Sequence, residues 1–159
     1  MSVIMPVFNA ERFVLKAIQS IANQTYQNWE LLICDDSSTD KSYDLVVQAT
    51  SNLGHKVRLF RNASNLKLLK TRNMMLREAS GELITFQDAD DFSDPLRLEK
   101  MVSEFQSNPA LGLLATQVGY VSETGALLRT SKKPTDYHSV LKLIYEQNVI
   151  GGSVMMIRK

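Results

Sequence analysis

The stretch FQDADDF, residues 86–92, places three carboxylates within four positions directly after an apolar run. Asp88, Asp90 and Asp91 repel one another and gain nothing from a hydrophobic core. Carboxylates at alternate positions can face one cation, and the small Ala89 between them leaves the backbone accessible to a ligand. Hard oxygen ligands suit Mg²⁺ or Mn²⁺, which often complete their shell with phosphate oxygens and water. A metal–phosphate site is one interpretation, and a helix N-terminus whose dipole favours acidic residues is the other.

A second polar cluster, DDSSTD at residues 35–40, also follows an apolar run. An Asx-turn or N-cap accounts for its serines and threonine without any function. Two adjacent acids, Asp35 and Asp36, are more than a turn needs, and one of them could accept hydrogen bonds from a base or a ribose. Phe8, in PVFN, is either an ordinary core or rim aromatic or a ring that stacks on a nucleobase.

Arg72 is a charged residue on the apolar stripe of an expected helix. It lies four residues after Leu68 and three before Met75, so the three side chains share one face. A charge on such a face snorkels, pairs, or meets an anionic ligand. An ion pair with one of the clustered aspartates and a contact to a diphosphate or nucleotide are the two interpretations.

Strand-like and helix-like stretches alternate along the chain, and Asn9 is expected to cap the first helix. Strands are expected at residues 2–7, 29–34, 57–60, 83–86 and 153–157, and helices at 13–22, 43–50, 66–79, 95–105 and 137–146, with a hairpin-type excursion at 112–129. This alternation predicts an α/β fold with a mainly parallel sheet covered by helices on both faces. Ligands of such sheets bind outside the carboxyl ends of the strands, where PVFN, DDSS and DADD are all expected to meet.

Composition excludes several classes of protein. The 159 residues carry 18 basic and 17 acidic side chains and a net charge of +1, so nucleic acid is not an expected partner. No apolar run approaches the roughly 20 residues of a transmembrane helix, and the first residues lack the pattern of a signal peptide. Cys34 is the single cysteine, which rules out an internal disulfide. We expect a cytoplasmic location, and a position at the inner face of a membrane stays open.

Three longer stretches carry a family resemblance: SVIMPVFNAERFVLKAIQSIANQTYQNWELLICDDSSTD, NLKLLKTRNMMLREASGELITFQDADD and GGSVMMIRK. In order and spacing, over nearly the whole chain, they resemble family-2 glycosyltransferases of the GT-A fold. The resemblance implies a Rossmann-like, mainly parallel sheet and a single nucleotide-sugar-binding domain over residues 1–159. It also implies glycosyl transfer from a nucleotide-sugar donor, with a UDP-sugar favoured, to a glycan or other hydroxyl acceptor, and a divalent metal, Mn²⁺ or Mg²⁺.

The same resemblance implies roles for residues on the base side of the donor site. Pro6 and Phe8 would border the base, although the family more often has tyrosine at Phe8. Asp36 would accept a hydrogen bond from the pyrimidine ring, with Asp35 behind it. Arg72 would approach the nucleotide.

On the phosphate side, Asp88 and Asp90 match the family's DxD pair, with Ala89 between them. Asp88 would point toward the ribose and Asp90 would bind the metal, and both belong to the expected metal site. The metal would bridge the diphosphate and offset charge on the leaving group. The family often has glycine where this chain has Lys67, and we expect the lysine to change the local turn.

The resemblance places the general base of the family after the strand that resembles SVMMIRK, so the base is expected beyond Lys159. We therefore expect residues 1–159 to be an N-terminal fragment that lacks the acceptor and base segment. Such a fragment would bind the donor with little or no transfer, since general-base catalysis contributes about 10²–10⁴-fold.

Three other classes of protein are alternatives to this interpretation. A glycosyltransferase relative that binds nucleotides without catalysis stays open. A phosphoacceptor receiver domain should have its acidic pair after the first strand, where PVFN stands instead. A nucleotidyltransferase should have a glycine-rich, basic loop at that place, and the loop is absent.

Overall fold

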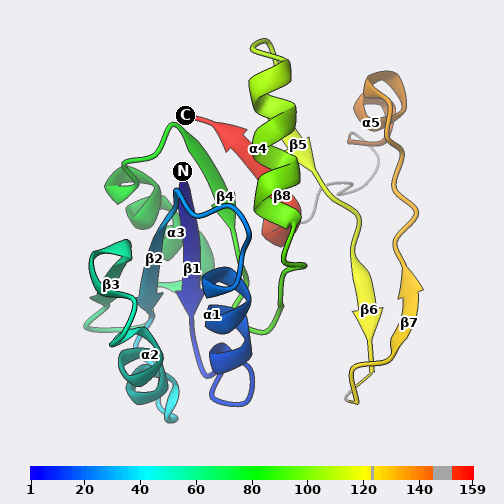
Figure 1. The fold of residues 1–159 in the computed structure, drawn as a ribbon. Helices are drawn as coiled ribbons and strands as arrows, with labels where there is room; N and C mark the ends of the chain where they lie inside the picture. Colours follow the sequence, from blue (N-terminus) through cyan, green and yellow to red (C-terminus); the bar gives the residue numbers. More distant parts are fainter. Residues whose placement is uncertain (123, 145–151) are drawn as a thin grey trace.

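A computed structural model describes residues 1–122, 124–144 and 152–159. The main sheet has six strands in the order β3-β2-β1-β4-β8-β5. Their bounds are β1 Ser2–Val7, β2 Glu30–Asp35, β3 Val57–Arg61, β4 Leu83–Phe86, β5 Leu113–Ala115 and β8 Met155–Arg158. The pairs β3–β2, β2–β1 and β1–β4 are parallel, and β8 runs antiparallel to both β4 and β5. The predicted mainly parallel sheet is confirmed, and the carboxyl ends of β1, β2 and β4 reach the same edge (Figure 1).

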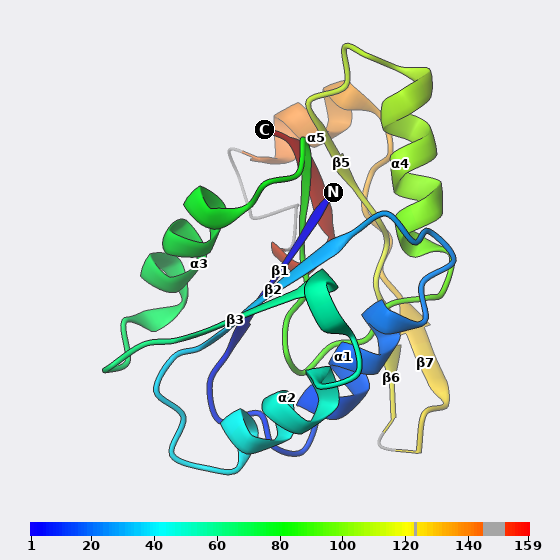
Figure 2. The same cartoon turned by 60° about the vertical axis from the view of Figure 1, so that its left-hand side comes forward.

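Helices cover both faces of this sheet, as predicted. The covering helices are α1 Val14–Ala22, α2 Ser42–Thr50, α3 Lys67–Glu78 and α4 Arg97–Ser107. A further helix, α5 Tyr137–Ile144, and two short 3₁₀ turns, η1 Gly54–Lys56 and η2 Gly152–Val154, complete the described helices. Side chains of α1, α2 and α4 pack in one core, whereas α3 packs in a separate core on the opposite face (Figure 2). Strand β1 shows the division: Val3 and Met5 belong to the first core and Ile4 to the second, because successive side chains of a strand alternate.

The expected cap of the first helix is wrong. Helix α1 begins at Val14 without a side-chain cap, and Asn9 has φ 48°. The Asn9 side chain instead accepts a hydrogen bond from the backbone N–H of Thr39, 2.9 Å away in the loop after β2. Asn9 therefore links the loop after β1 to the loop after β2 and does not cap a helix.

The expected hairpin-type excursion divides into two parts. Strand β5 joins the edge of the main sheet, whereas β6 Gly119–Val121 and β7 Leu127–Thr130 form a separate antiparallel pair (Figure 1). Helix α5 follows, and its expected end at Glu146 lies outside the described residues. No helix among the described residues is long and apolar enough to span a bilayer.

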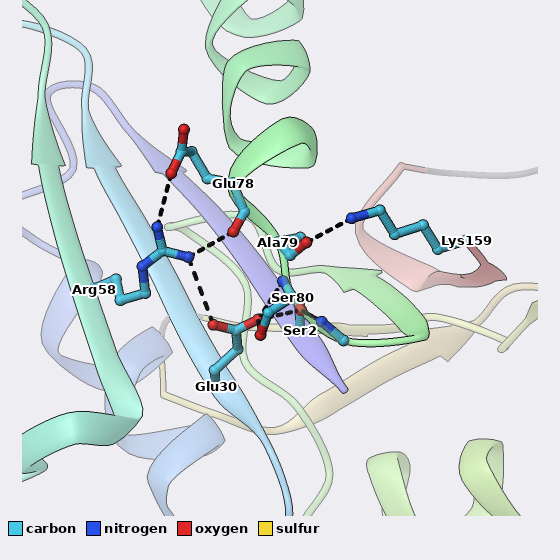
Figure 3. Close-up of polar contacts among 8 residues, drawn as sticks. Ser2, Glu30, Arg58, Glu78, Ala79, Ser80 and Lys159 are labelled. Atoms are coloured by element: carbon cyan, nitrogen blue, oxygen red, sulfur yellow. Dashed lines mark hydrogen bonds and ion pairs between the residues drawn. The ribbon is translucent and has the colours of Figure 1, made fainter.

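At the sheet edge opposite the three motifs, a polar network joins β2, β3 and the turn after α3 (Figure 3). Glu30 accepts hydrogen bonds from the Ser80 amide, at 2.7 Å, and from the hydroxyl groups of Ser2 and Ser80. Arg58 contacts both Glu30, at 3.8 Å, and Glu78, at 2.7 Å. Burial alone would raise the pKa of Glu30, but these hydrogen bonds and the Arg58 charge outweigh it and hold the pKa below its ordinary value.

Candidate functional site

A cleft of about 420 Å³ lies at the carboxyl edge of the sheet. Its walls come from the loops after β1, β2 and β4 and from the start of α3, so the three sequence motifs meet there as predicted. The lining residues are Pro6, Val7, Phe8, Asn9, Ala10, Phe13, Asp36, Asn65, Lys67, Leu68, Thr71, Asp88, Ala89 and Asp90. Six of the eight residues assigned to the donor site line this cleft, and Asp35 and Arg72 are not among its lining residues.

The loops after β1 and β2 are tied together by hydrogen bonds. The Asn9 N–H donates to the Ser38 hydroxyl at 3.0 Å, and the Ala10 N–H donates to the Ser42 hydroxyl at 2.7 Å. The Asp36 N–H donates to the Val7 carbonyl at 2.8 Å. The serines of the second motif therefore have a structural role, which was the simpler interpretation of that motif.

Asp36 is a buried residue, 4% exposed, that lines the cleft. Its Oδ1 accepts from Asn62 Nδ2 at 2.7 Å and from the Leu66 N–H at 2.8 Å, and its Oδ2 accepts from the Lys67 N–H at 2.9 Å. Burial would raise the pKa of Asp36, but these donors, together with Thr71, hold it below the ordinary value. Oδ1 accepts two of these hydrogen bonds and Oδ2 accepts one, so Oδ2 is the oxygen with more capacity for a ligand.

Asp35 lies behind Asp36, as the sequence predicted, and is fully buried. Its Oδ2 forms an ion pair with Arg61 Nε at 3.2 Å and accepts from the Ser38 N–H at 3.2 Å. The Arg61 guanidinium in turn lies 4.1 Å from the centroid of the Tyr43 ring. Asp35 thus holds the loop after β2 in place, away from the cleft surface.

The two residues of the first motif differ in exposure. Pro6 is buried and lines the cleft, whereas Phe8 is 47% exposed there. An aromatic face left open beside a carboxylate acceptor can stack on a planar ring whose polar edge meets that carboxylate. This arrangement suits a nucleobase.

The acidic turn after β4 begins with an ion pair. Arg72 Nη2 donates to Asp88 Oδ1, and the Arg72 side chain is only 15% exposed because it lies over the Phe86 ring. The structural interpretation of Arg72, a pair with a clustered aspartate, is confirmed. Burial raises the pKa of Asp88, Arg72 opposes that rise, and repulsion from Asp91 and Asp90 adds to it.

Asp90 contrasts with Asp88. It is exposed, and it lines both this cleft and a neighbouring one of about 760 Å³ whose lining includes residues of β6 and β7. Within residues 1–122, 124–144 and 152–159, the Asp90 carboxylate has no hydrogen-bond or ion-pair partner, and no group of three metal-ligating side chains occurs. A hard cation at Asp90 would therefore need oxygens from a ligand and from water, a shell that Mg²⁺ and Mn²⁺ often adopt.

Asn62 and Lys67 also shape the site, and the sequence did not predict their contacts with Asp36. Asn62 follows β3 at the same carboxyl edge, and its position after a predicted strand was the signal that could have revealed it. Lys67 was expected to change its turn, but it has φ 69°, the left-handed conformation that glycine favours. Its backbone N–H reaches Asp36 because of that conformation.

Arg97 is a second arginine at the acidic turn, on the α4 side of β4. It is 9% exposed and donates to Thr85 Oγ1, Gln87 Oε1 and Ser93 Oγ at 2.9, 3.3 and 2.9 Å. Burial lowers the pKa of Arg97 to about 10, although the charges of Asp91 and Asp88 oppose the shift. No local pattern in the sequence distinguishes this arginine from a solvated one.

Comparison with solved structures places this architecture among known folds. S. aureus TarS 1-349, solved in complex with UDP-GlcNAc, matches 99% of this chain and 44% of its own with a TM-score of 0.77 at 24% identity. The mannosyltransferase PcManGT from Pyrobaculum calidifontis, solved with GDP-Man and Mn²⁺, matches the same 99% and 44% with a TM-score of 0.74 at 20% identity. At these identities the likeness shows a shared fold, the GT-A fold.

Sequence comparison gives the family. The Escherichia coli protein named as the UDP-Glc:alpha-D-GlcNAc-diphosphoundecaprenol beta-1,3-glucosyltransferase WfgD is 37% identical over 107 residues, 67% of this chain and 41% of the relative. The chain spans about half the length of the curated relatives it matches. The family model described as glycosyl transferase family 2 matches residues 2–159. The chain therefore belongs to glycosyl transferase family 2.

Proposed function

We propose that this chain is the donor-binding domain of an inverting glycosyltransferase, with a UDP-sugar as the favoured donor and a glycan or other hydroxyl as acceptor. One observation carries the proposal: a single cleft is lined by an exposed aromatic ring, by a buried carboxylate and by an acidic side chain that has no partner among the described residues. These groups suit, in that order, a base, its polar edge and a cation bound to diphosphate. The UDP-Glc in the name of WfgD and the UDP-GlcNAc bound to TarS support the choice of donor.

On the base side, Phe8 stacks on the uracil ring, with Pro6 beside it at the cleft wall. Asp36 Oδ2 accepts the ring N–H, because Oδ2 accepts one hydrogen bond from the Lys67 N–H whereas Oδ1 accepts two from the protein. Asp35 keeps the Asp36 loop in place from behind. These two roles explain why Asp36 lines the cleft whereas Asp35 is buried and paired with Arg61.

On the phosphate side, Asp90 would hold Mn²⁺ or Mg²⁺, since its carboxylate is exposed and without a protein partner among the described residues. Asp88 has one oxygen engaged by Arg72 and offers the other toward the ribose and the metal, and Ala89 lets the donor approach the backbone. A bound divalent ion supplies Lewis-acid stabilisation of the departing diphosphate. The Mn²⁺ bound to PcManGT supports this cofactor.

Inverting transfer forms a bond between the acceptor oxygen and the anomeric carbon while the bond from that carbon to the diphosphate breaks. A general base takes the proton of the acceptor hydroxyl. The residues described above act on the donor: they orient the nucleotide and hold the diphosphate end of the breaking bond beside Asp90.

The test is thermal unfolding of the chain with UDP, GDP, ADP or CDP, each with and without Mn²⁺. At about 100 times its Kd, a ligand stabilises by about 2.7 kcal/mol, which raises Tm by roughly 5–10 °C for a chain of this size. We expect that rise with UDP and Mn²⁺, and a much smaller one in Asp90→Ala. Asp44→Ala, at an exposed position of α2, is the matched control and should respond like the unaltered chain. An equal response to all four nucleotides, or none, would contradict the proposed donor.

A further inference from the structure

Gly152, in the 3₁₀ turn η2, is in close contact with Arg72. A Cβ built on Gly152 would lie 2.6 Å from Arg72 Nη1, 3.3 Å from Cζ and 3.4 Å from Nη2. A Cβ atom does not approach a nitrogen to 2.6 Å, so a side chain at position 152 and the Arg72 guanidinium cannot both keep their places. The three nearest atoms all belong to Arg72, which makes the conflict specific to this pair.

Arg72 cannot move aside without consequence. Its side chain is largely buried over the Phe86 ring, with 5.2 Å from Cζ to the ring centroid. The guanidinium is a rigid plane, so displacing Nη1 also moves Nη2, the nitrogen that donates to Asp88. A methyl group at position 152 would therefore shift the cation that holds the first carboxylate of the acidic turn.

The segment that contains Gly152 is also fixed from the other side of the sheet. Arg97 Nη2, on α4, donates to the Ser153 carbonyl at 2.8 Å, and Thr85 Oγ1, in β4, donates to the Met155 carbonyl at 2.7 Å. Strand β8 continues from this segment and pairs with β4. Because the backbone at 152–155 is held against β4, it cannot easily withdraw to make room for a side chain.

We propose that Gly152 is a positioning residue for the donor site: the absence of a side chain there keeps Arg72 on Asp88 and so fixes the acidic turn that receives the donor. Gly152 does not line the donor cleft and acts only through Arg72. The contact joins α3 to η2 across 80 positions of sequence. The proposal rests on the proposed function in so far as the turn is a donor site.

The experiment is a double-mutant cycle with Gly152→Ala, Arg72→Ala and the double variant, because coupling between two sites is measured by non-additivity. UDP affinity with Mn²⁺ is measured by calorimetry. We expect Gly152→Ala to weaken UDP binding about 10-fold, the order of one charge-assisted hydrogen bond, and to have no further effect once Arg72 is alanine. Gly112→Ala is the matched control, because its Cβ would meet no atom within 4 Å.

The same cycle on Tm separates this proposal from the donor assignment, since it requires no ligand. Gly152→Ala should lower Tm in the unaltered chain and leave Tm unchanged in the Arg72→Ala background, where the conflicting atoms are gone. If Gly152→Ala fails to fold, recovery of folding in the double variant gives the same result. Additive effects on Tm, or UDP binding by Gly152→Ala equal to that of Gly112→Ala, would overturn the proposal. Coupling in Tm without UDP binding by the unaltered chain would uphold the contact and refute the donor assignment.

Discussion

Asp36→Asn tests the proposed role of the buried Asp36 carboxylate, because an amide differs from a carboxylate in only one heavy atom. Oδ1 accepts two hydrogen bonds and Oδ2 accepts one, from the Lys67 N–H, so the amide oxygen should take the Oδ1 position. The amide NH₂ then faces the Lys67 N–H, and two donors meet. The remaining acceptor position on Oδ2, which we assign to the ligand, is lost as well.

The expected magnitude follows from these contacts. Two charge-assisted hydrogen bonds become neutral, at about 1 kcal/mol each, and the third is lost. The Lys67 N–H also reaches Asn65 Oδ1 at 3.0 Å, so this third loss costs only about 1 kcal/mol. Relief from burying a charge offsets part of the sum. We expect the free energy of unfolding to fall by about 2–3 kcal/mol, and UDP affinity to fall roughly 10- to 100-fold.

Urea unfolding at pH 7 measures the first quantity and calorimetry with UDP and Mn²⁺ the second. Asp44→Asn makes the same chemical change at an exposed position of α2 and should alter stability by less than about 0.5 kcal/mol. If Asp36→Asn unfolds with the same free energy as Asp44→Asn, Asp36 does not organise the cleft. If only the UDP affinity is unchanged, Asp36 is a structural residue and does not contact the base.

Three further outcomes are expected. Glu30→Gln should lower stability at pH 7, and its difference from the unaltered chain should shrink as pH falls below the ordinary Glu pKa near 4.5. The reason is that a depressed pKa contributes stability only while the carboxyl group stays ionised. A difference in the free energy of urea unfolding that is the same at pH 3 and pH 7 would contradict this. Lys67→Gly should raise stability by about 0.5–1 kcal/mol, because glycine adopts φ 69° without strain. Lys70→Gly, inside α3, should lower stability by about 1 kcal/mol. If both variants lose the same free energy of unfolding in urea, Lys67 is not strained. Arg97→Met should cost about 2–5 kcal/mol by leaving buried acceptors unpaired, and an unchanged Tm would show that the acidic turn does not depend on them.

The sequence predicted the parts of this molecule that depend on local patterns. Strand β4 was predicted with its observed bounds. Its apolar residues begin just after Gly81, and the acidic turn follows its last residue, Phe86. The meeting of PVFN, DDSS and DADD followed from one rule about parallel sheets, and the cleft confirms it. The pairing of Arg72 with an aspartate was within reach because a charge on an apolar stripe needs a partner.

Other features arise only from contacts between distant segments. Asn9 has the chemistry of a helix cap, yet its side chain joins the loop after β2, a choice that depends on the packing of two loops. Lys67 adopts a glycine-like conformation that a lysine gives no reason to expect. The proximity of Gly152 to Arg72 has no sequence signal, since a glycine in a turn is compatible with many causes.

The central claim is that the acidic turn after β4 binds a divalent cation that carries the donor's diphosphate. A crystal of the chain soaked with UDP and Mn²⁺, with anomalous data collected at the manganese edge, tests this claim most directly. We expect a manganese peak bound by the Asp90 carboxylate and the diphosphate oxygens, with the uracil ring stacked on Phe8. A manganese peak elsewhere, or an Asp90 side chain turned into solvent while UDP is bound, would contradict the account.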